Sequence, residues 1–274
     1  MENSFVKNKL EQIKREGYGL HLEGVLSDAF DIHKKSILPG FVVTLLYFLI
    51  LMIVGLSMFG MVYGMSLTEF METAQRNPNA LEAALSNIAL NSKLISSLLS
   101  AVVTALITPM LAGLYKVAYN TQYGGNGSVS DLFVYYKQPY FSNIVIYTFL
   151  FTAIMQLVNV GFDEFIPGFG SFIYLILFII LSVFLVFTIP FIVFGNFSWI
   201  EAVKSSISVT SKNWFFLLFI LAISFIISFI GVIFCGVGIL FTFPFLYIAT
   251  FVLYDKIIGF NNEADDISKI GEIQ

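Results

Sequence analysis

The residues of this chain best suited to metal binding or acid–base catalysis are its two histidines, His21 and His33. Imidazole changes charge near neutral pH and is a common metal ligand. The two rings would share a helix face only if the helix between them were unbroken, and Gly24 argues against that. A zinc site would also need further ligands. We therefore interpret both as solvated surface histidines and expect no metal site.

Three carboxylates form the next group, because Asp28, Asp131 and Glu201 each come before an apolar hairpin. One hypothesis is a ring of carboxylates at one side of a helix bundle. The alternative, which we favour, is that they lie at helix N-termini, where negative charge is stabilising. Ser198 with Glu201 fits a capping box, and Ser128 with Asp131 is a looser version of it.

Polar and helix-bending residues inside apolar stretches form the third group. Gln156 and Asn159 could line a polar cavity, but hydrogen bonding between helices is the more common role and the one we favour. Pro109, Pro190 and Pro244 could belong to a moving or ligand-binding element, although packing kinks are the favoured interpretation. All five are candidate contacts with a partner or ligand.

No pattern in the sequence predicts catalysis. There is no Walker loop, nucleophile elbow or zinc motif. No Asp, Glu, Lys, Arg or His lies deep in an apolar stretch, whereas ion-coupled transporters and proton pumps usually need such groups. No basic region is large enough to suggest nucleic acid. We therefore expect a protein that is not an enzyme and that uses no cofactor.

Composition determines the elements that must carry these residues. The chain is 58% apolar and 12% charged, about half the charge that a soluble domain needs. The bilayer is the obvious solvent for the uncovered apolar surface, and a span needs about 20 apolar residues. We predict a single all-α membrane domain over residues 1–274. Its six expected spans are 37–60, 94–116, 141–160, 171–195, 214–233 and 236–254.

The distribution of basic residues predicts the orientation. Every Lys and Arg except Arg76 and Lys93 falls on one side of the expected spans, and this side is cytoplasmic by the positive-inside rule. Both termini are then cytoplasmic, with a polar segment over 1–36 and a tail over 255–274. No apolar run near the start resembles a cleavable signal, so the first span is expected to act as an uncleaved one. We expect a bacterial inner-membrane protein with several spans.

An internal repeat is the main organising feature of the sequence. A short amphipathic stretch comes before the first, third and fifth spans, and a proline lies in the second, fourth and sixth. Pro109 precedes Asn120, Pro190 precedes Glu201 and Pro244 precedes Asp255, always at the same distance along the chain. We therefore expect three repeats of an interfacial amphipathic helix and a kinked hairpin, packed around a pseudo-threefold axis.

The first repeat contains one large insertion, over residues 65–93, on the extracytoplasmic side. Ser66 and Glu69 indicate a capping box, and a second short helix is expected to follow. Leu81, Leu85 and Ile88 share one face of that second helix and are candidate contacts. The insertion could pack on lipid, on a partner or on its own bundle, and we favour its own bundle.

Several of these motifs resemble a known bacterial family. They are Glu201–Ser206, Lys212–Phe215, Gly236–Gly238, Pro244 and Tyr254 near the end, and Pro109–Asn120, Gly124–Gly125 and Asp131–Phe133 in the middle. They look like the membrane domain attached to some glycerophosphodiester phosphodiesterases and its stand-alone six-helix relatives. The resemblance covers roughly residues 20–258 and implies a fold rather than an activity. The phosphodiesterase barrel of those enzymes has no counterpart in these 274 residues.

Two functions fit this sequence. The first is a non-catalytic accessory subunit or scaffold, bound to the bilayer and to another membrane protein, or assisting envelope biogenesis. The second is a passive conduit or binder for lipids or other lipophilic small molecules. We favour the first, because no set of residues converges on a site.

Overall fold

The computed structural model describes residues 2–77, 79, 88–234 and 236–260, and within them all regular structure is helical. The membrane-length helices form where apolar residues run for about 20 positions or more. In chain order the longer elements are α1 (Glu2–Glu16), α2 (Leu22–Lys35), α3 (Ile37–Tyr63), α4 (Leu67–Arg76), α6 (Leu90–Tyr123), α7 (Tyr140–Phe165), α8 (Gly170–Phe184), α10 (Trp199–Thr210), α11 (Trp214–Phe229) and α13 (Phe245–Ile257). Shorter elements are η1 (Val129–Tyr136), α9 (Thr188–Val193), η2 (Ile230–Ile233) and α12 (Ile239–Thr242).

Six helical stretches are long and apolar enough to cross a membrane, as the sequence predicted. They cover Ile37–Gly60, Leu90–Tyr123, Tyr140–Phe165, Gly170–Val193, Trp214–Ile233 and Ile239–Ile257. The second stretch extends beyond the expected 94–116 at both ends. Residues 90–93 add another turn, and the helix continues to Tyr123, where Gly124 follows. The first and fifth stretches have the expected bounds.

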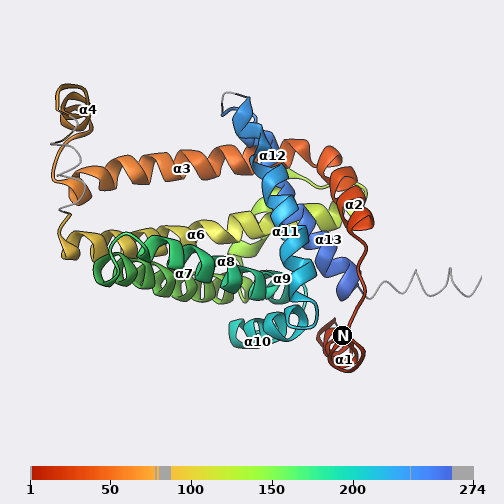
Figure 1. Cartoon of the computed structure of the whole chain (residues 1–274). Coiled ribbons are helices and arrows are strands. Elements are labelled where there is room, and N and C mark those ends of the chain that lie inside the picture. Colours follow the sequence, from red (N-terminus) through yellow and green to blue (C-terminus); the bar gives the residue numbers. More distant parts are fainter. Residues whose placement is uncertain (1, 78, 80–87, 235, 261–274) are drawn as a thin grey trace, which may run out of the picture.

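The two ends of the molecule differ (Figure 1). The first helix, α1, and the end of α13 lie at one end, here called the α1 end, and α4 lies at the other, here called the α4 end. The connections between α6 and α7 and between α10 and α11 are also on the side of the α1 end. The described chain therefore goes out and back in hairpins that begin and finish at the α1 end.

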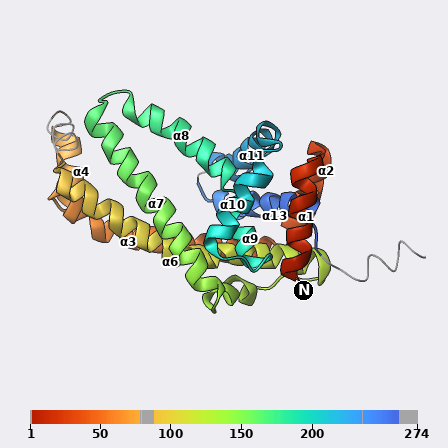
Figure 2. The same ribbon diagram turned by 90° about the horizontal axis from the view of Figure 1, so that it is seen from below.

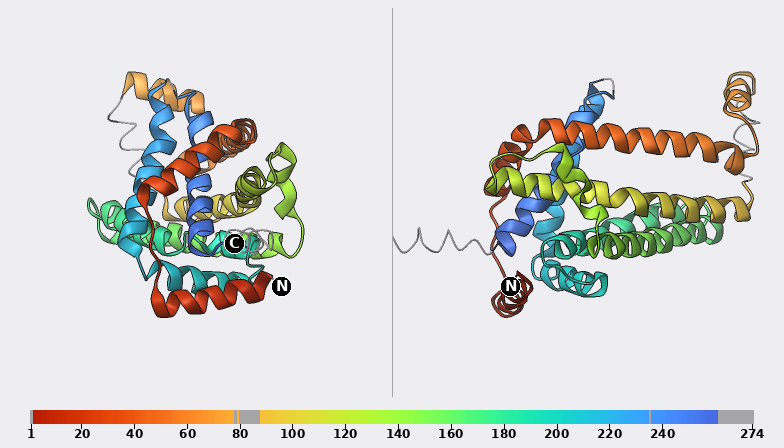
Figure 3. Two further views of the ribbon diagram at one scale, coloured as in Figure 1. Left: turned by 90° about the vertical axis from the view of Figure 1, so that its right-hand side faces the viewer. Right: turned by 180° about the vertical axis from the view of Figure 1, so that it is seen from behind.

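The third hairpin is not aligned with the first two, which differs from the expected arrangement. In Figure 1 α11 crosses the direction of α3 and α6, and in Figure 2 it is seen almost along its axis while α3 and α6 lie in the plane of view. Figure 3 shows the same crossing from two further sides. Gly40 at the start of α3 permits the crossing, because a Cβ there would lie 2.9 Å from Cγ of Pro244. The backbone of α3 at Gly40 and the ring of Pro244 are thus in close contact, and a larger residue at position 40 would push them apart.

The three prolines affect their helices differently. Pro109 lies inside the continuous helix α6, whereas α8 and α9 are separated by residues 185–187, just before Pro190. Pro244 directly precedes α13, which makes the sixth stretch two helices rather than the single one expected. Proline removes a backbone donor and leaves a carbonyl without its partner. Two neighbouring hydroxyls bind backbone carbonyls, Thr108 that of Thr104 at 2.7 Å and Thr242 that of Ser228 at 2.8 Å.

The core lies toward the α1 end, where the segments that follow the three prolines meet. Their aromatic rings contact one another across the three hairpins: Phe194 lies 5.9 Å from Tyr119, 5.9 Å from Phe251 and 5.5 Å from Tyr254, measured between ring centroids. Such separations are typical of favourable aromatic pairs. The buried residues of these segments include Leu111, Ala112, Leu114, Tyr115, Val117, Ala118, Phe191, Ile192, Val193, Phe245, Ile248, Ala249, Phe251, Val252, Leu253 and Tyr254.

Two glycines allow unusually close backbone packing. A methyl group built on Gly113 of α6 would lie 2.6 Å from the carbonyl carbon of Leu132, so η1 rests directly on α6 at this point. A methyl group on Gly231 would collide with the backbone of Gly238, which lets the third hairpin turn tightly between α11 and α12. The sequence predicted two spans in this last apolar stretch, 214–233 and 236–254, and the close approach of Gly231 and Gly238 lets the chain turn between them.

Candidate functional site

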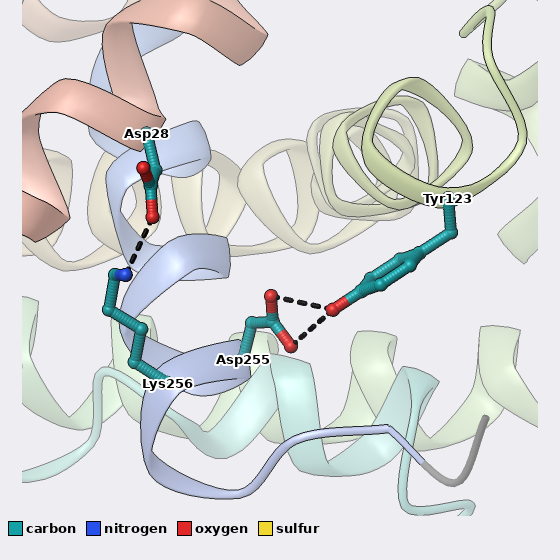
Figure 4. Close-up of polar contacts among 4 residues, drawn as sticks. All are labelled: Asp28, Tyr123, Asp255 and Lys256. Atoms are coloured by element: carbon teal, nitrogen blue, oxygen red, sulfur yellow. Dashed lines mark hydrogen bonds and ion pairs between the residues drawn. The ribbon is translucent and has the colours of Figure 1, made fainter. Parts of the chain in front are cut away.

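A cluster of four polar side chains joins three helices at the α1 end (Figure 4). The ammonium of Lys256 on α13 lies 2.6 Å from Oδ2 of Asp28 on α2. The neighbouring Asp255 accepts hydrogen bonds from the Tyr123 hydroxyl at the end of α6, at 2.7 Å to Oδ1 and 2.8 Å to Oδ2. The ion pair is a third to nearly half exposed, so it contributes at most about 1 kcal/mol. The cluster joins α2, α6 and α13 to one another at this end of the molecule.

Sequence reasoning did not find this cluster, although it noted Asp28 and Asp255 separately. The partners come from the start, middle and end of the chain, so no local spacing reveals them. The expectation that Asp28 caps a helix is wrong. The helix α2 begins at Leu22 with His21 as its N-cap, which places Asp28 well inside the helix, where it faces Lys256.

The other two carboxylates lie where the capping interpretation predicted. Asp131 accepts a hydrogen bond from the backbone N–H of Ser128 at 2.8 Å, and the element that it starts is the 3₁₀ helix η1. Glu201 accepts one from the N–H of Ser198 at 3.2 Å, while the Ser198 hydroxyl accepts the N–H of Glu201 at 3.4 Å. These bonds satisfy backbone donors that the first turn leaves free. Asp28, Asp131 and Glu201 thus have separate structural partners rather than one shared ligand site.

Polar contacts also join the helices toward the α4 end. The Ser100 hydroxyl of α6 donates to Oε1 of Gln156 on α7 at 2.8 Å, which is the hydrogen bond between helices that the sequence favoured. Asn159 lies one turn further along α7 and is half-buried. Beyond it, Asp163 accepts a hydrogen bond from the Ser171 hydroxyl of α8 at 2.7 Å. These residues again hold neighbouring helices together.

The remaining candidate contacts are dispersed. Pro109, Pro190 and Pro244 are all buried, so each is placed to shape packing. Ile88 is half-buried, whereas Leu81 and Leu85 lie outside the described residues. The structure therefore does not bring these candidates together with Gln156 and Asn159 in one place.

His33 departs from the expected solvated histidine. Its ring packs edge-on against Phe245 of α13, with centroids 5.6 Å apart, and its Nδ1 is buried without a hydrogen-bond partner in the described part of the chain. Burial lowers the pKa of His33, and a hydrogen bond with the backbone of Phe241 opposes that shift. His21 is exposed, as expected. The interpretation as a surface residue is therefore wrong for His33, because the third hairpin crosses over α2 at this point.

This environment predicts an acid-sensitive contact. With its pKa lowered in the folded state, His33 contributes stability that is present above the ordinary histidine pKa of about 6.5 and is lost as the pH falls below it. We expect the thermal stability of the detergent-purified protein to decline from pH 7 to pH 5, and to decline less for His33→Gln. His21→Gln is the control and should behave as the wild type. Equal slopes for all three proteins would contradict the prediction.

A shallow groove lies between α1 and α10, also at the α1 end. Lys7, Lys14 and Lys204 line it together with Glu11 and Glu201, and its hollow measures about 240 Å³. The Ser198 hydroxyl and N–H, followed by the ammonium groups of Lys7 and Lys204, hold the pKa of Glu201 below its usual range. Lys7 also lies 5.7 Å from the centre of the Phe197 ring. Charges of both signs therefore line an open surface at this end of the molecule.

Within the described residues, no group of three or more His, Cys, Asp or Glu side chains could hold a metal ion. The fold and these contacts define an all-α protein with six helices that could span a membrane, in which the polar side chains mainly join helices. Comparison of the chain with protein-family models, with curated proteins and with solved structures found no match.

Proposed function

We propose that the protein crosses the bacterial inner membrane six times, with both termini in the cytoplasm. The six apolar helices support the spans, and the charge bias supports the orientation, since Arg76 and Lys93 belong to the α4 end and the other basic residues of the described chain to the α1 end. The position of α1 and the end of α13 at one end of the molecule is consistent with termini on a single side (Figure 1).

A topology experiment tests this orientation. A reporter that is active only outside the cytoplasm should be silent when fused after Gln274 and active when inserted between Glu72 and Thr73 of α4. A cytoplasm-active reporter should give the opposite pattern at the same two sites. Extracytoplasmic activity after Gln274 would contradict an even number of spans.

We further propose that the three hairpins are copies of one repeat, related to the membrane domain of the glycerophosphodiester phosphodiesterase family. Support comes from the recurring proline, from the common burial of the segments after it, and from a short helical element before each hairpin. The crossing of the third hairpin requires that the copies are no longer packed around an exact threefold axis. The family relation rests on the motifs alone.

We propose that the protein acts without catalysis, as an accessory subunit or scaffold for another membrane protein or for envelope biogenesis. The observation that carries this proposal is that the candidate polar side chains other than the two histidines are mostly engaged in joining or capping helices. Asp28 pairs with Lys256, Asp255 with Tyr123, and Gln156 with Ser100. A fold fastened in this way holds surfaces in fixed positions, and the groove between α1 and α10 is one such surface.

The alternative, a conduit or binder for lipophilic molecules, keeps support from the apolar surface of the six helices. Purification from native membranes in mild detergent, followed by mass spectrometry, separates the two functions. We expect a stoichiometric protein partner that is lost when Lys7, Lys14 and Lys204 are changed to Gln together, and retained when Lys9, Lys34 and Lys212, none of which lines the groove, are changed instead. A lone protomer that carries a defined lipid would overturn the scaffold proposal and favour the alternative.

A further inference from the structure

The helix α4 has an apolar face that the described protein barely covers. Leu67, Phe70, Met71 and Ala74 follow the spacing of one helix face, here called the α4 apolar face. Leu67 is 45% exposed and Met71 53% exposed, and no residue of α4 is buried. The sequence favoured packing of the whole insertion on its own bundle. Within the described residues, α4 contacts the bundle through Phe70, which packs on α3, while Leu67 and Met71 stay exposed.

The direction of α4 fits a helix that lies flat on a membrane. Figure 1 shows α4 almost along its axis, at the far end of α3, while α3 lies in the plane of view. Figures 2 and 3 agree, since α4 there runs across the direction of α3. The turn at Gly64, with a positive φ of 67°, ends α3 and redirects the chain. In Figure 1 both α3 and α11 run close to the plane of view, so α4, seen along its axis, is nearly at right angles to both and lies parallel to the bilayer surface for a membrane normal anywhere between these two span directions.

The rotation of α4 about its own axis is also fixed. The Phe70 ring packs edge-on against Phe59 of α3, with centroids 5.1 Å apart. Phe59 belongs to the membrane-spanning part of α3, so the α4 apolar face is turned back toward the bilayer rather than away from it. On the opposite side, Glu72 and Arg76 form an exposed ion pair at 3.7 Å. The helix therefore has an apolar side toward lipid and a charged side toward water.

A capping box makes this helix well defined from its first turn. The Ser66 N–H donates to the Glu69 carboxylate at 2.7 Å, and the N–H of Glu69 donates to the Ser66 hydroxyl at 3.2 Å. These bonds satisfy donors that would otherwise be costly at the edge of the apolar layer. They also hold the pKa of Glu69 below its usual value, so its carboxylate stays charged at the surface.

We propose that α4 is an interfacial helix that inserts its apolar face into the outer leaflet and so anchors the outer end of α3. The occupant of this face is the lipid surface itself, because the face continues the exposed apolar surface of α3, where Met52, Ile53 and Leu56 are all more than half exposed. Its charged residues include more acidic than basic groups, so insertion depends on apolar burial rather than on attraction to anionic lipid. The inference depends on α3 crossing the bilayer.

Spin labels on single cysteines test this placement in reconstituted vesicles. Cys235 is the only cysteine, so Cys235→Ala gives a clean background. Met71→Cys and Ala74→Cys place labels on the α4 apolar face, and Glu72→Cys and Arg76→Cys are matched controls on its charged side. Ile53→Cys is a reference on α3. Collisions with oxygen report lipid, and collisions with a water-soluble nickel complex report water.

We expect the oxygen-to-nickel collision ratio to be several-fold higher at positions 71 and 74 than at 72 and 76, and highest at 53. If all four labels on α4 are accessible to nickel while the label at position 53 is exposed to lipid, the proposal of an interfacial helix is overturned. The proposal that α3 crosses the membrane is not affected by that result. Exclusion of both reagents from 71 and 74 would also overturn it, because protein would then cover the face. Nickel access at 53 would contradict the membrane position of α3, and with it both proposals.

Discussion

Replacing Gly113 by alanine is expected to destabilise the protein by about 3 kcal/mol, at the upper end of the cost of overpacking. The added methyl group would lie 2.6 Å from the carbonyl carbon of Leu132, and the obstacle is backbone rather than a side chain that can rotate. The element η1 would have to move away from α6, and the buried side chain of Leu132 would move with it. The apparent melting temperature in detergent should fall by roughly 6–12 °C.

Gly55→Ala is the matched control for this substitution. Gly55 also lies in one of the six long apolar helices, but a methyl group there meets nothing within 4 Å. Because alanine favours the helical backbone by about 1 kcal/mol over glycine, this variant should be as stable as the wild type or slightly more stable. A small effect at position 113, equal to that at 55, would show that η1 does not rest on α6 as described.

Truncating Phe194 to alanine is expected to cost about 3 kcal/mol. The ring is 8% exposed and contacts Tyr119 of α6 as well as Phe251 and Tyr254 of α13, so its loss loosens the meeting point of all three hairpins. Removal of a buried phenyl ring costs about 3–5 kcal/mol in soluble proteins. The lower end applies here because lipid is itself apolar and weakens the hydrophobic contribution.

Phe172→Ala makes the same chemical change on a surface. Phe172 lies on α8 and is 63% exposed, so its ring has few protein contacts to lose. Thermal unfolding in detergent should therefore separate the two variants clearly, with Phe172→Ala close to the wild type. Phe194→Leu should recover part of the loss, because leucine fills most of the cavity. Comparable losses at 194 and 172 would contradict a core at this end of the molecule.

Much of the local structure follows from short-range pattern. The capping of α10 by Ser198 and Glu201 is set within one turn of helix, so the motif alone predicted it correctly. The six apolar stretches were predictable for a similar reason, since their length and composition suffice to make helices that could cross a bilayer. A hydrogen bond between Gln156 and a neighbouring helix was predicted, because a polar side chain among apolar neighbours needs a partner. Its partner, Ser100, was not identified.

The sequence by itself thus determined the apolar helices and two of the three caps, because each depends on residues within a few turns of one another. The tertiary structure decided the pairing of Asp28 with Lys256, the burial of His33 and the crossing of the third hairpin. These depend on contacts between segments more than a hundred residues apart, such as Gly40 against Pro244. No local period encodes which helix lies across which, since small residues and side-chain volumes settle that only when the helices meet.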